Sequence, residues 1–298
     1  MDLLSPSIPT PLQRLSNAEI DKAGVQLYIK RDDLIHPAVS GNKWRKLKYN
    51  LIEAQERGER TILTFGGAYS NHLYATAAAG NALGFKTIGM VRGLELESKD
   101  NATLQFCRAQ GMQLQFVTRE EYRLRHSDAY LREVAARFGN PYMIPEGGST
   151  ALALQGVAEM VLEVASQLGG MTDFIATAAG TGGTAAGILS AGADVLAFSA
   201  LKGGHFLRED IQQFVTECKN PGNLTLLTDY HFGGYAKWNH ELLAFMQDFR
   251  SEFGIQLEQV YTAKMFYGLF DLIQKGYFKP GTTIVAVHTG GLQGLIKT

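Results

Sequence analysis

The sequence lacks the features that would indicate a disulfide scaffold, a metal site or a membrane protein. Its two cysteines, Cys107 and Cys218, lie far apart and form no CxxC or CxxH spacing, so neither a disulfide framework nor a structural zinc site is expected. No HxH or HExxH spacing indicates a catalytic metal. No run of 18 apolar residues and no basic start followed by an apolar stretch is present, so we expect no membrane span, no signal peptide and a cytoplasmic location.

An excess of charge of one sign is also missing. The 28 Lys and Arg residues are matched by 29 Asp and Glu residues, which gives a formal net charge of −1, and no long run of either sign occurs. Nucleic acid and anionic membrane surfaces are therefore not expected as partners, and a small molecule is. The chain has 298 residues, of which 45% are hydrophobic, enough for one large core or two ordinary ones.

Glycine is abundant, and the 33 glycines cluster just after short apolar runs. Such runs alternate with helical patterns: a strand over 61–65 precedes a helix over 72–83, and a strand over 173–178 precedes a helix over 183–190. A single helix is expected over 119–138. The alternation predicts an α/β fold whose parallel sheets are covered by helices on both faces. Ligands of such sheets bind beyond the carboxyl ends of the strands, where the glycine turns fall.

The most specific glycine turn runs from Ala178 to Thr184, between a strand and a helix. Its three glycines allow the backbone to approach an anion closely, the helix start directs N–H groups toward it, and two threonine hydroxyls add donors. The turn therefore predicts a phosphate site, although a tight turn without a ligand has the same local pattern. A dinucleotide site would need an acidic residue at the end of the next strand, 194–199, where none occurs. A P-loop would need a GK[ST] ending, which is also missing.

Two further stretches carry candidate chemistry. Lys43 follows a Ser-Gly-Asn turn at the start of a predicted amphipathic helix over 43–57, where the positive end of the helix dipole disfavours an ammonium and favours a nucleophilic amine. A solvated surface lysine is the alternative for this stretch alone. The turn over 66–72 ends at another helix start, with Ser70 or Asn71 as the N-cap, and it could bind a carboxylate.

A phosphate turn, a lysine at a helix start and a carboxylate-binding turn are together the parts needed for pyridoxal-phosphate chemistry on an amino acid. The chain resembles the fold type II (tryptophan synthase β-like) pyridoxal-phosphate enzymes, and within them the 1-aminocyclopropane-1-carboxylate deaminase/D-cysteine desulfhydrase family. The resemblance covers nearly the whole chain. The motifs that carry it are Ser40-Gly41-Asn42-Lys43 with Arg45-Lys46-Leu47, Gly66-Gly67 with Ser70-Asn71-His72, Gly180-Thr181-Gly182-Gly183-Thr184, and His288-Thr289-Gly290-Gly291.

The resemblance implies a two-domain subunit, with residues 1–48 and 147–298 in a larger domain, residues 49–146 in a smaller one, and pyridoxal 5'-phosphate in the cleft between them. It implies a homodimer. It also implies roles for individual residues: Lys43 would carry the cofactor covalently, and Asn71 would bind the ring hydroxyl. The implied phosphate site comprises Gly180, Thr181, Gly182, Gly183 and Thr184, with Lys46 beside them. The implied substrate site comprises Ser70, Asn71, His72, Tyr235 and Tyr261, of which Ser70 and Tyr261 would also act in catalysis.

One position departs from the ring-opening members of this family, which carry a glutamate against the pyridine nitrogen where this chain has Thr262. A hydroxyl cannot hold that nitrogen protonated as a carboxylate does, so the ring would be a weaker electron sink. We therefore expect a lyase that eliminates sulfide from a small D-amino acid such as D-cysteine and yields pyruvate and ammonia. The alternatives are the ring-opening deaminase, which is a hydrolase, a β-replacement synthase, a catalytically idle amino-acid or cofactor-binding protein, and a nicotinamide oxidoreductase, which would need the missing ribose-binding acid.

Overall fold

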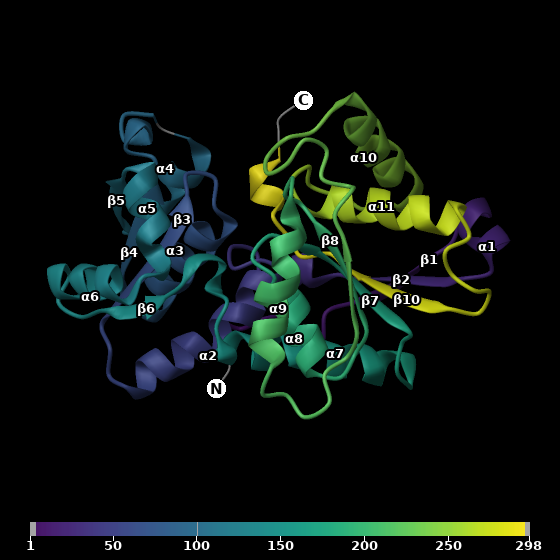
Figure 1. The fold of residues 1–298 in the computed structure, drawn as a ribbon, viewed down its shortest axis with the longest axis horizontal. Helices are drawn as coiled ribbons and strands as arrows, with labels where there is room; N and C mark the ends of the chain where they lie inside the picture. Colours follow the sequence, from purple (N-terminus) through teal and green to yellow (C-terminus); the bar gives the residue numbers. More distant parts are fainter. Residues whose placement is uncertain (1–3, 100, 296–298) are drawn as a thin grey trace.

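The computed structural model describes residues 4–99 and 101–295, which form two lobes that lie side by side (Figure 1). Each lobe is built around one sheet. The chain begins in the larger lobe, crosses to the smaller lobe for the strands between residues 61 and 144, and returns to the larger lobe to its end.

The larger lobe contains a six-stranded sheet in the order β1-β2-β10-β7-β8-β9. Its strands are β1 (Leu12–Leu15), β2 (Gln26–Lys30), β7 (Phe174–Ala179), β8 (Val195–Ser199), β9 (Leu224–Leu227) and β10 (Thr283–Val287). All neighbouring strands are parallel except β1 and β2, which are antiparallel. Nearly every residue of β7 and β8 is buried, because helices cover both faces of this sheet.

Two helical layers enclose the larger sheet, and each has its own apolar core. One layer consists of α1 (Ala18–Ala23), α10 (His240–Phe253) and α11 (Thr262–Gln274), and the other of α7 (Ala151–Leu168), α8 (Gly183–Ser190) and α9 (Leu207–Val215). Of the helices in residues 4–99 and 101–295, α7 alone has the length and composition of a membrane span, and in the fold it packs against α2 (Asn42–Glu56) and α8.

The smaller lobe contains a four-stranded parallel sheet in the order β5-β4-β3-β6. Its strands are β3 (Thr61–Gly67), β4 (Lys86–Arg92), β5 (Gln113–Val117) and β6 (Tyr142–Ile144). Helices α3 (Asn71–Leu83) and α4 (Ala102–Ala109) cover one face, and α5 (Arg119–Arg123) and α6 (Asp128–Arg137) cover the other. Helix α2 joins the lobes, since it packs against α7 and also contributes to a core of the smaller lobe.

The α/β class with parallel sheets covered by helices is confirmed, and two local expectations need correction. The single helix expected over 119–138 is wrong, because Ser127 has an extended backbone (φ −85°, ψ 124°) that separates α5 from α6. Strand β1 and helix α1 were not expected at all. The predicted domain boundaries, 1–48 with 147–298 and 49–146, stay a prediction; the strands of the smaller sheet all fall within the second range.

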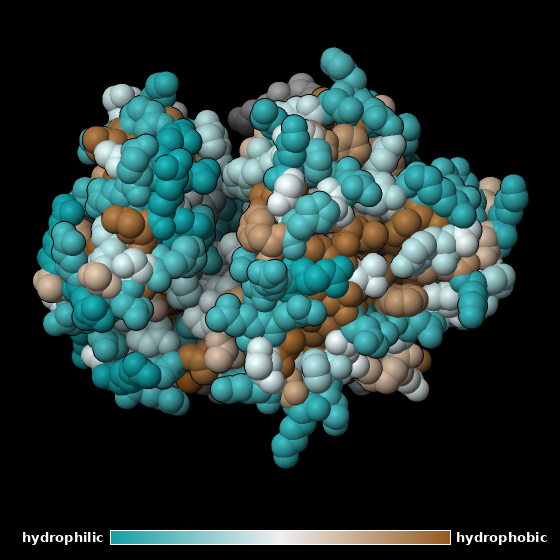
Figure 2. Space-filling view, viewed as in Figure 1, coloured by the Kyte–Doolittle hydropathy of each residue, from teal (hydrophilic) through white to brown (hydrophobic). Residues whose placement is uncertain are grey.

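The carboxyl ends of strands from both sheets meet at the groove between the lobes, which the space-filling view also displays (Figure 2). Gly67 ends β3, Pro145 follows β6, Gly180 follows β7, and Thr289 lies just after β10; all four line one cavity there. The fold therefore brings the glycine turns of both lobes to a single place, as expected for parallel sheets.

Candidate functional site

The cavity between the lobes has a volume of about 770 Å³, within the range of pockets that enclose a cofactor or drug-sized ligand. Most side chains predicted for the site line it, although they come from segments far apart in the sequence. These residues are Lys43, Lys46, Ser70, Asn71, His72, Gly180, Thr181, Gly182, Gly183, Thr184, Tyr235 and Tyr261.

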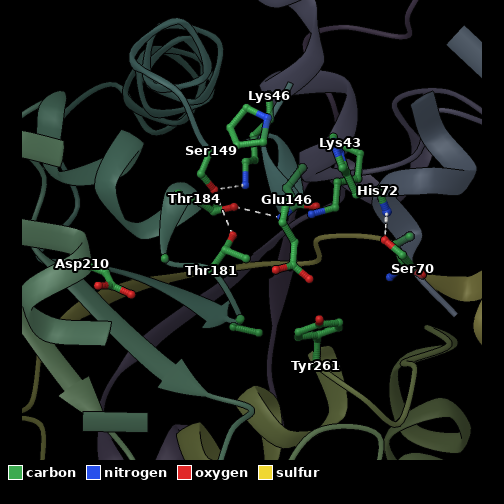
Figure 3. A pocket seen from close by; sticks show the side chains of 18 of the residues that line it. Lys43, Lys46, Ser70, His72, Glu146, Ser149, Thr181, Thr184, Asp210 and Tyr261 are labelled. Atoms are coloured by element: carbon green, nitrogen blue, oxygen red, sulfur yellow. Dashed lines mark hydrogen bonds between the residues drawn. The ribbon is translucent and has the colours of Figure 1, made fainter. Parts of the chain in front are cut away.

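Lys43 lies in the first turn of α2, just after Gly41, and reaches into the cavity (Figure 3). Gly41 has a φ of 62°, and a Cβ there would lie 1.9 Å from the Thr289 carbonyl oxygen, so only glycine lets these two turns meet. Burial lowers the pKa of Lys43 to about 8, while the carboxylate of Glu146 raises it. At neutral to mildly alkaline pH a substantial share of this amine is therefore neutral and able to attack a carbonyl.

Lys46 lies one turn further along α2 and is fully buried. Its ammonium donates a hydrogen bond of 2.8 Å to the Ser149 hydroxyl, which lies 2.9 Å from the Thr181 hydroxyl (Figure 3). Burial lowers the pKa of Lys46 far below its usual value, and the nearby amine of Lys43 lowers it further. Two amines thus share a cavity in which the inner one, Lys46, contacts a neutral hydroxyl, an arrangement that an anion would stabilise.

Glycines keep the space around Lys46 open. A Cβ on Gly183 would lie 2.4 Å from the Ser149 hydroxyl and 2.9 Å from the Lys46 amine. A Cβ on Gly147 would lie 2.7 Å from the Thr181 hydroxyl. The start of α8 at Gly183 contributes unpaired backbone N–H groups to the same space. This set of one cation, two hydroxyls and a helix start fits a phosphate dianion.

The turn before α3 supplies a second group of polar side chains. The Ser70 hydroxyl is the N-cap, as expected, and accepts from the backbone N–H groups of His72 and Leu73, both at 3.2 Å. Its own hydrogen remains available to a ligand, because those two bonds use only the oxygen's lone pairs. The Asn71 side-chain oxygen accepts a hydrogen bond of 2.9 Å from the Gln293 amide.

The His72 side chain is buried behind this turn and is neutral, since burial and the amines of Lys43 and Lys46 lower its pKa well below the usual value. The Thr64 hydroxyl donates to the Ile144 carbonyl at 2.7 Å, so it must accept from Nε2–H of His72 at 2.8 Å. The other ring nitrogen, Nδ1, is then an acceptor, and the structure gives it no partner among the residues it describes. The imidazole therefore offers no hydrogen-bond donor to a substrate carboxylate. The backbone N–H of His72 is also in use, because it donates to the Ser70 hydroxyl.

Tyr235 and Tyr261 stand edge to face in the cavity, with ring centroids 6.0 Å apart. Burial raises the pKa of both hydroxyls, and that of Tyr261 most strongly. Both are therefore protonated donors over the working pH range.

Thr262 is placed differently from the prediction. It is fully buried, and it is not among the described residues that line the cavity. Its hydroxyl accepts from the backbone N–H of Glu258 at 2.9 Å and donates to the Glu258 carbonyl at 3.3 Å. Adjacent residues at a helix start point in directions about 100° apart, so Tyr261 faces the cavity while Thr262 faces back to Glu258. A direct contact between Thr262 and the cofactor ring is therefore not supported by this geometry.

Several residues of the cavity wall, among them Asn42, Ser149 and Glu146, were not identified as site residues from the sequence. Asn42 donates a hydrogen bond of 2.9 Å from its side chain to the Thr184 hydroxyl, and Ser149 joins Lys46 to Thr181. Glu146 follows β6, and its carboxylate extends into the cavity toward Tyr261 (Figure 3). The available signal for Glu146 and Ser149 was the polar turn Pro145 to Thr150, which follows a short strand and contains two adjacent glycines.

The Glu146 carboxylate is held on its far side by the smaller lobe. The Tyr122 hydroxyl donates to one oxygen at 2.9 Å, and Arg125 pairs with the other at 2.6 Å. Within residues 4–99 and 101–295, no group of three or more His, Cys, Asp and Glu side chains is arranged to bind a metal ion. The arrangement supports amine and proton-transfer chemistry around a bound phosphate.

Comparison with known proteins agrees with this geometry. The family model described as "Pyridoxal-phosphate dependent enzyme" matches residues 4–290. The chain is 33% identical to a putative 1-aminocyclopropane-1-carboxylate deaminase of Pyrococcus horikoshii, over 96% of this chain and 90% of that protein. It is 32% identical to a D-cysteine desulfhydrase of Klebsiella pneumoniae, over 96% and 93% of the two chains. A bifunctional protein of Arabidopsis thaliana that combines both names is 33% identical, over 97% and 77%.

Solved structures give the same grouping. A crystal structure described as an ACC deaminase homologue superposes with a TM-score of 0.83 at 31% identity and covers 96% of this chain and 90% of its own. A hydrogen sulfide-producing enzyme of Fusobacterium nucleatum superposes with a TM-score of 0.70 over 98% and 97% of the two chains, but at 16% identity it supports the fold alone.

Proposed function

Because the chain belongs to the pyridoxal-phosphate-dependent enzymes, with pyridoxal 5'-phosphate as its cofactor, we propose that it is a lyase that acts on a small D-amino acid, with D-cysteine as the model substrate. The net reaction is the hydrolytic elimination of D-cysteine to pyruvate, ammonia and hydrogen sulfide. When bound, the cofactor supplies an electron sink for the charge that develops at the substrate Cα.

The chain's own residues divide into a binding part and a proton-transfer part. Lys46, with the Ser149 and Thr181 hydroxyls and the start of α8, would hold the phosphate. Lys43 would provide the amine that carries the cofactor and would also accept the Cα proton, a task suited to a pKa of about 8. The Ser70 hydroxyl and the N–H groups at the start of α3 receive the substrate carboxylate.

The two tyrosines complete the site on the side of the larger lobe. Their hydroxyls are protonated donors in the wall of the cavity, and Tyr261 is the better buried of the two. We assign Tyr261 to proton transfer near the leaving group and Tyr235 to substrate contact, because a protonated phenol can act as a general acid.

The observation that favours elimination over ring opening is the absence of a free carboxylate at the start of α11 among the described residues. Thr262, which stands at the position of the acidic residue, faces away from the cavity and brings no carboxylate to it, and the carboxylate of Glu258 is occupied by the N–H groups of Val260, Tyr261 and Thr262 at 2.7, 2.7 and 2.6 Å. Without a carboxylate beside its ring nitrogen the cofactor would be a weaker electron sink, which would favour a substrate whose leaving group is a good thiolate over a strained carbon–carbon bond. The preference for the D-configuration rests on the similarity to D-cysteine desulfhydrase.

A substrate panel tests this proposal. Purified holoenzyme is assayed with D-cysteine, L-cysteine, D-serine and 1-aminocyclopropane-1-carboxylate, and the keto acid, ammonia and sulfide are measured. D-Cysteine should give the highest kcat/KM. A preference for the cyclopropane substrate would replace the proposal by the ring-opening deaminase. A protein that shows the cofactor's absorbance but turns over none of the four would favour the idle binding protein.

We propose a cytoplasmic homodimer as the working form. The neutral overall charge and the small-molecule cavity give no role to nucleic acid or to a membrane surface. Figure 2 displays apolar residues gathered on the exposed face of the larger lobe, and the edge strand β9 leaves Leu224, Leu226 and Leu227 only partly covered. Apolar surface of this kind commonly marks a protein interface. Sedimentation equilibrium of the purified chain tests the dimer, and a monomer at micromolar concentration would contradict it.

A further inference from the structure

The loop that carries Tyr235 has a backbone that is unfavourable in isolation. Phe232 (φ 51°) and Ala236 (φ 53°) adopt left-handed conformations, and Gly233 (φ 91°) and Gly234 (φ 115°) between them also have positive φ. Left-handed backbone at a non-glycine residue costs about 1 kcal/mol or more, so this loop needs contacts from elsewhere to persist. Tyr235 lies inside it and is 39% exposed at the cavity wall.

The contact from elsewhere is a buried lysine. Lys264, on α11, is 1% exposed, and its ammonium donates a hydrogen bond of 2.7 Å to the carbonyl oxygen of Gly234. That carbonyl belongs to the peptide that leads into Tyr235. The Gly234 carbonyl also accepts a hydrogen bond of 3.2 Å from the Lys237 N–H. This second bond closes the turn that contains Tyr235. Burying the Lys264 ammonium costs free energy. Its hydrogen bond to Gly234 fixes the position of the peptide before Tyr235.

A buried carboxylate in the turn before α11 fixes the second tyrosine. Glu258 is 2% exposed, and its carboxylate accepts from the backbone N–H groups of Val260, Tyr261 and Thr262. Two of these N–H groups lie just before α11 and the third at its first residue, so Glu258 fixes the backbone from which the Tyr261 side chain projects. The two buried groups are also coupled, because the Glu258 carboxylate raises the pKa of Lys264 against the lowering caused by burial.

We propose that Glu258 and Lys264 are positioning residues that aim the two tyrosine hydroxyls into the cavity, Glu258 through the backbone of Tyr261 and Lys264 through the peptide before Tyr235. Glu258 and Tyr261 lie in the turn before α11, and Lys264 lies in the first turn of this helix, so one helix start brings carboxylate, phenol and ammonium together. The catalytic roles of the two tyrosines rest on the proposed function. Their placement by Glu258 and Lys264 does not depend on it.

The first test uses the protein without its cofactor. Lys264→Met keeps the length of the side chain and removes the donor, so amide hydrogen exchange should accelerate at least tenfold at Lys237 and its neighbours in the loop over 231–237, with the strands of the sheet unchanged. Lys275→Met is the matched control, because Lys275 ends the same helix on the surface, where it pairs with Asp271. Unchanged exchange in the loop of Lys264→Met would overturn the proposal, whether or not any substrate is turned over.

The second test is a double-mutant cycle on the holoenzyme with its best substrate. Lys264→Met should raise KM at least tenfold with a smaller change in kcat, and Tyr235→Phe should raise KM by itself. In the Tyr235→Phe background, Lys264→Met should have no more than a twofold further effect, since its target hydroxyl is already gone. Fully additive losses would mean that Lys264 supports the fold in general and would overturn the positioning role. Glu258→Gln, paired with Tyr261→Phe, repeats the cycle should Lys264→Met not fold.

Discussion

Replacing Lys46 with methionine should change stability and cofactor affinity in opposite directions. In the protein without cofactor, the Lys46 side chain is fully buried, its amine contacts the neutral Ser149 hydroxyl, and burial and the amine of Lys43 hold its pKa far below the usual value. Removing this desolvated amine should stabilise this form by about 1 kcal/mol or more, which corresponds to a rise in Tm of about 2 °C for a chain of this size. The methionine side chain fills nearly the same volume.

The cofactor-bound form should respond in the other direction, because Lys46 then loses the phosphate as its partner. A hydrogen bond to a charged group contributes about 1.5–3 kcal/mol, which is about a 10- to 100-fold increase in the cofactor's dissociation constant. Affinity is measured by absorbance titration of the protein without cofactor, and stability by calorimetry of the same sample. Lys48→Met is the control, since Lys48 pairs with Glu159 outside this cavity. A Lys46→Met protein that binds the cofactor within twofold of wild type would refute the phosphate assignment.

Two further predictions follow from the same cavity. Gly183→Ala puts a methyl group 2.4 Å from the Ser149 hydroxyl and 2.9 Å from the Lys46 amine, so cofactor affinity on dialysis should fall by about tenfold or more, whereas Gly170→Ala, with nothing within 4 Å, should not change it. The free energy of unfolding of the protein without cofactor should rise between about pH 8 and pH 10, because Lys43 binds a proton less tightly in the folded state (pKa about 8) than in the unfolded state (10.5), and urea titrations should find this rise reduced in Lys43→Met.

The parts of the site that could be predicted from the sequence are those encoded by adjacent residues. Three glycines and two threonines between a strand and a helix specify an anion turn wherever the rest of the chain lies, and the structure brings Gly180 to Thr184 to the cavity wall as expected. The position of Lys43 at a helix start could be predicted for the same reason, since the turn before it and the helix after it are both local features. The α/β class followed from the alternation of short apolar runs with helical patterns.

The parts that could not be predicted depend on contacts between distant segments. Ser149 joins the phosphate cradle because the three-residue strand β6 pairs with β3 and directs the following turn at Thr181, 32 residues away. Thr262 was expected in the site because the family resemblance places that position against the cofactor, yet its hydroxyl turns back to Glu258 and Tyr261 alone of the two lines the cavity. Strand β1 has only four residues, and its buried and exposed positions do not clearly alternate. The sequence therefore carried no strand pattern from which its antiparallel pairing with β2 could be predicted.

The most direct test of the central claim is to locate the lysine that carries the cofactor. Borohydride reduction of the yellow holoenzyme followed by peptide mass spectrometry should find the cofactor on Lys43 alone, and Lys43→Ala should lose both this covalent label and turnover while it retains the fold. A label on Lys46, Lys202 or Lys264 instead would contradict the account, because Lys46 is assigned to the phosphate and neither Lys202 nor Lys264 lines the cavity.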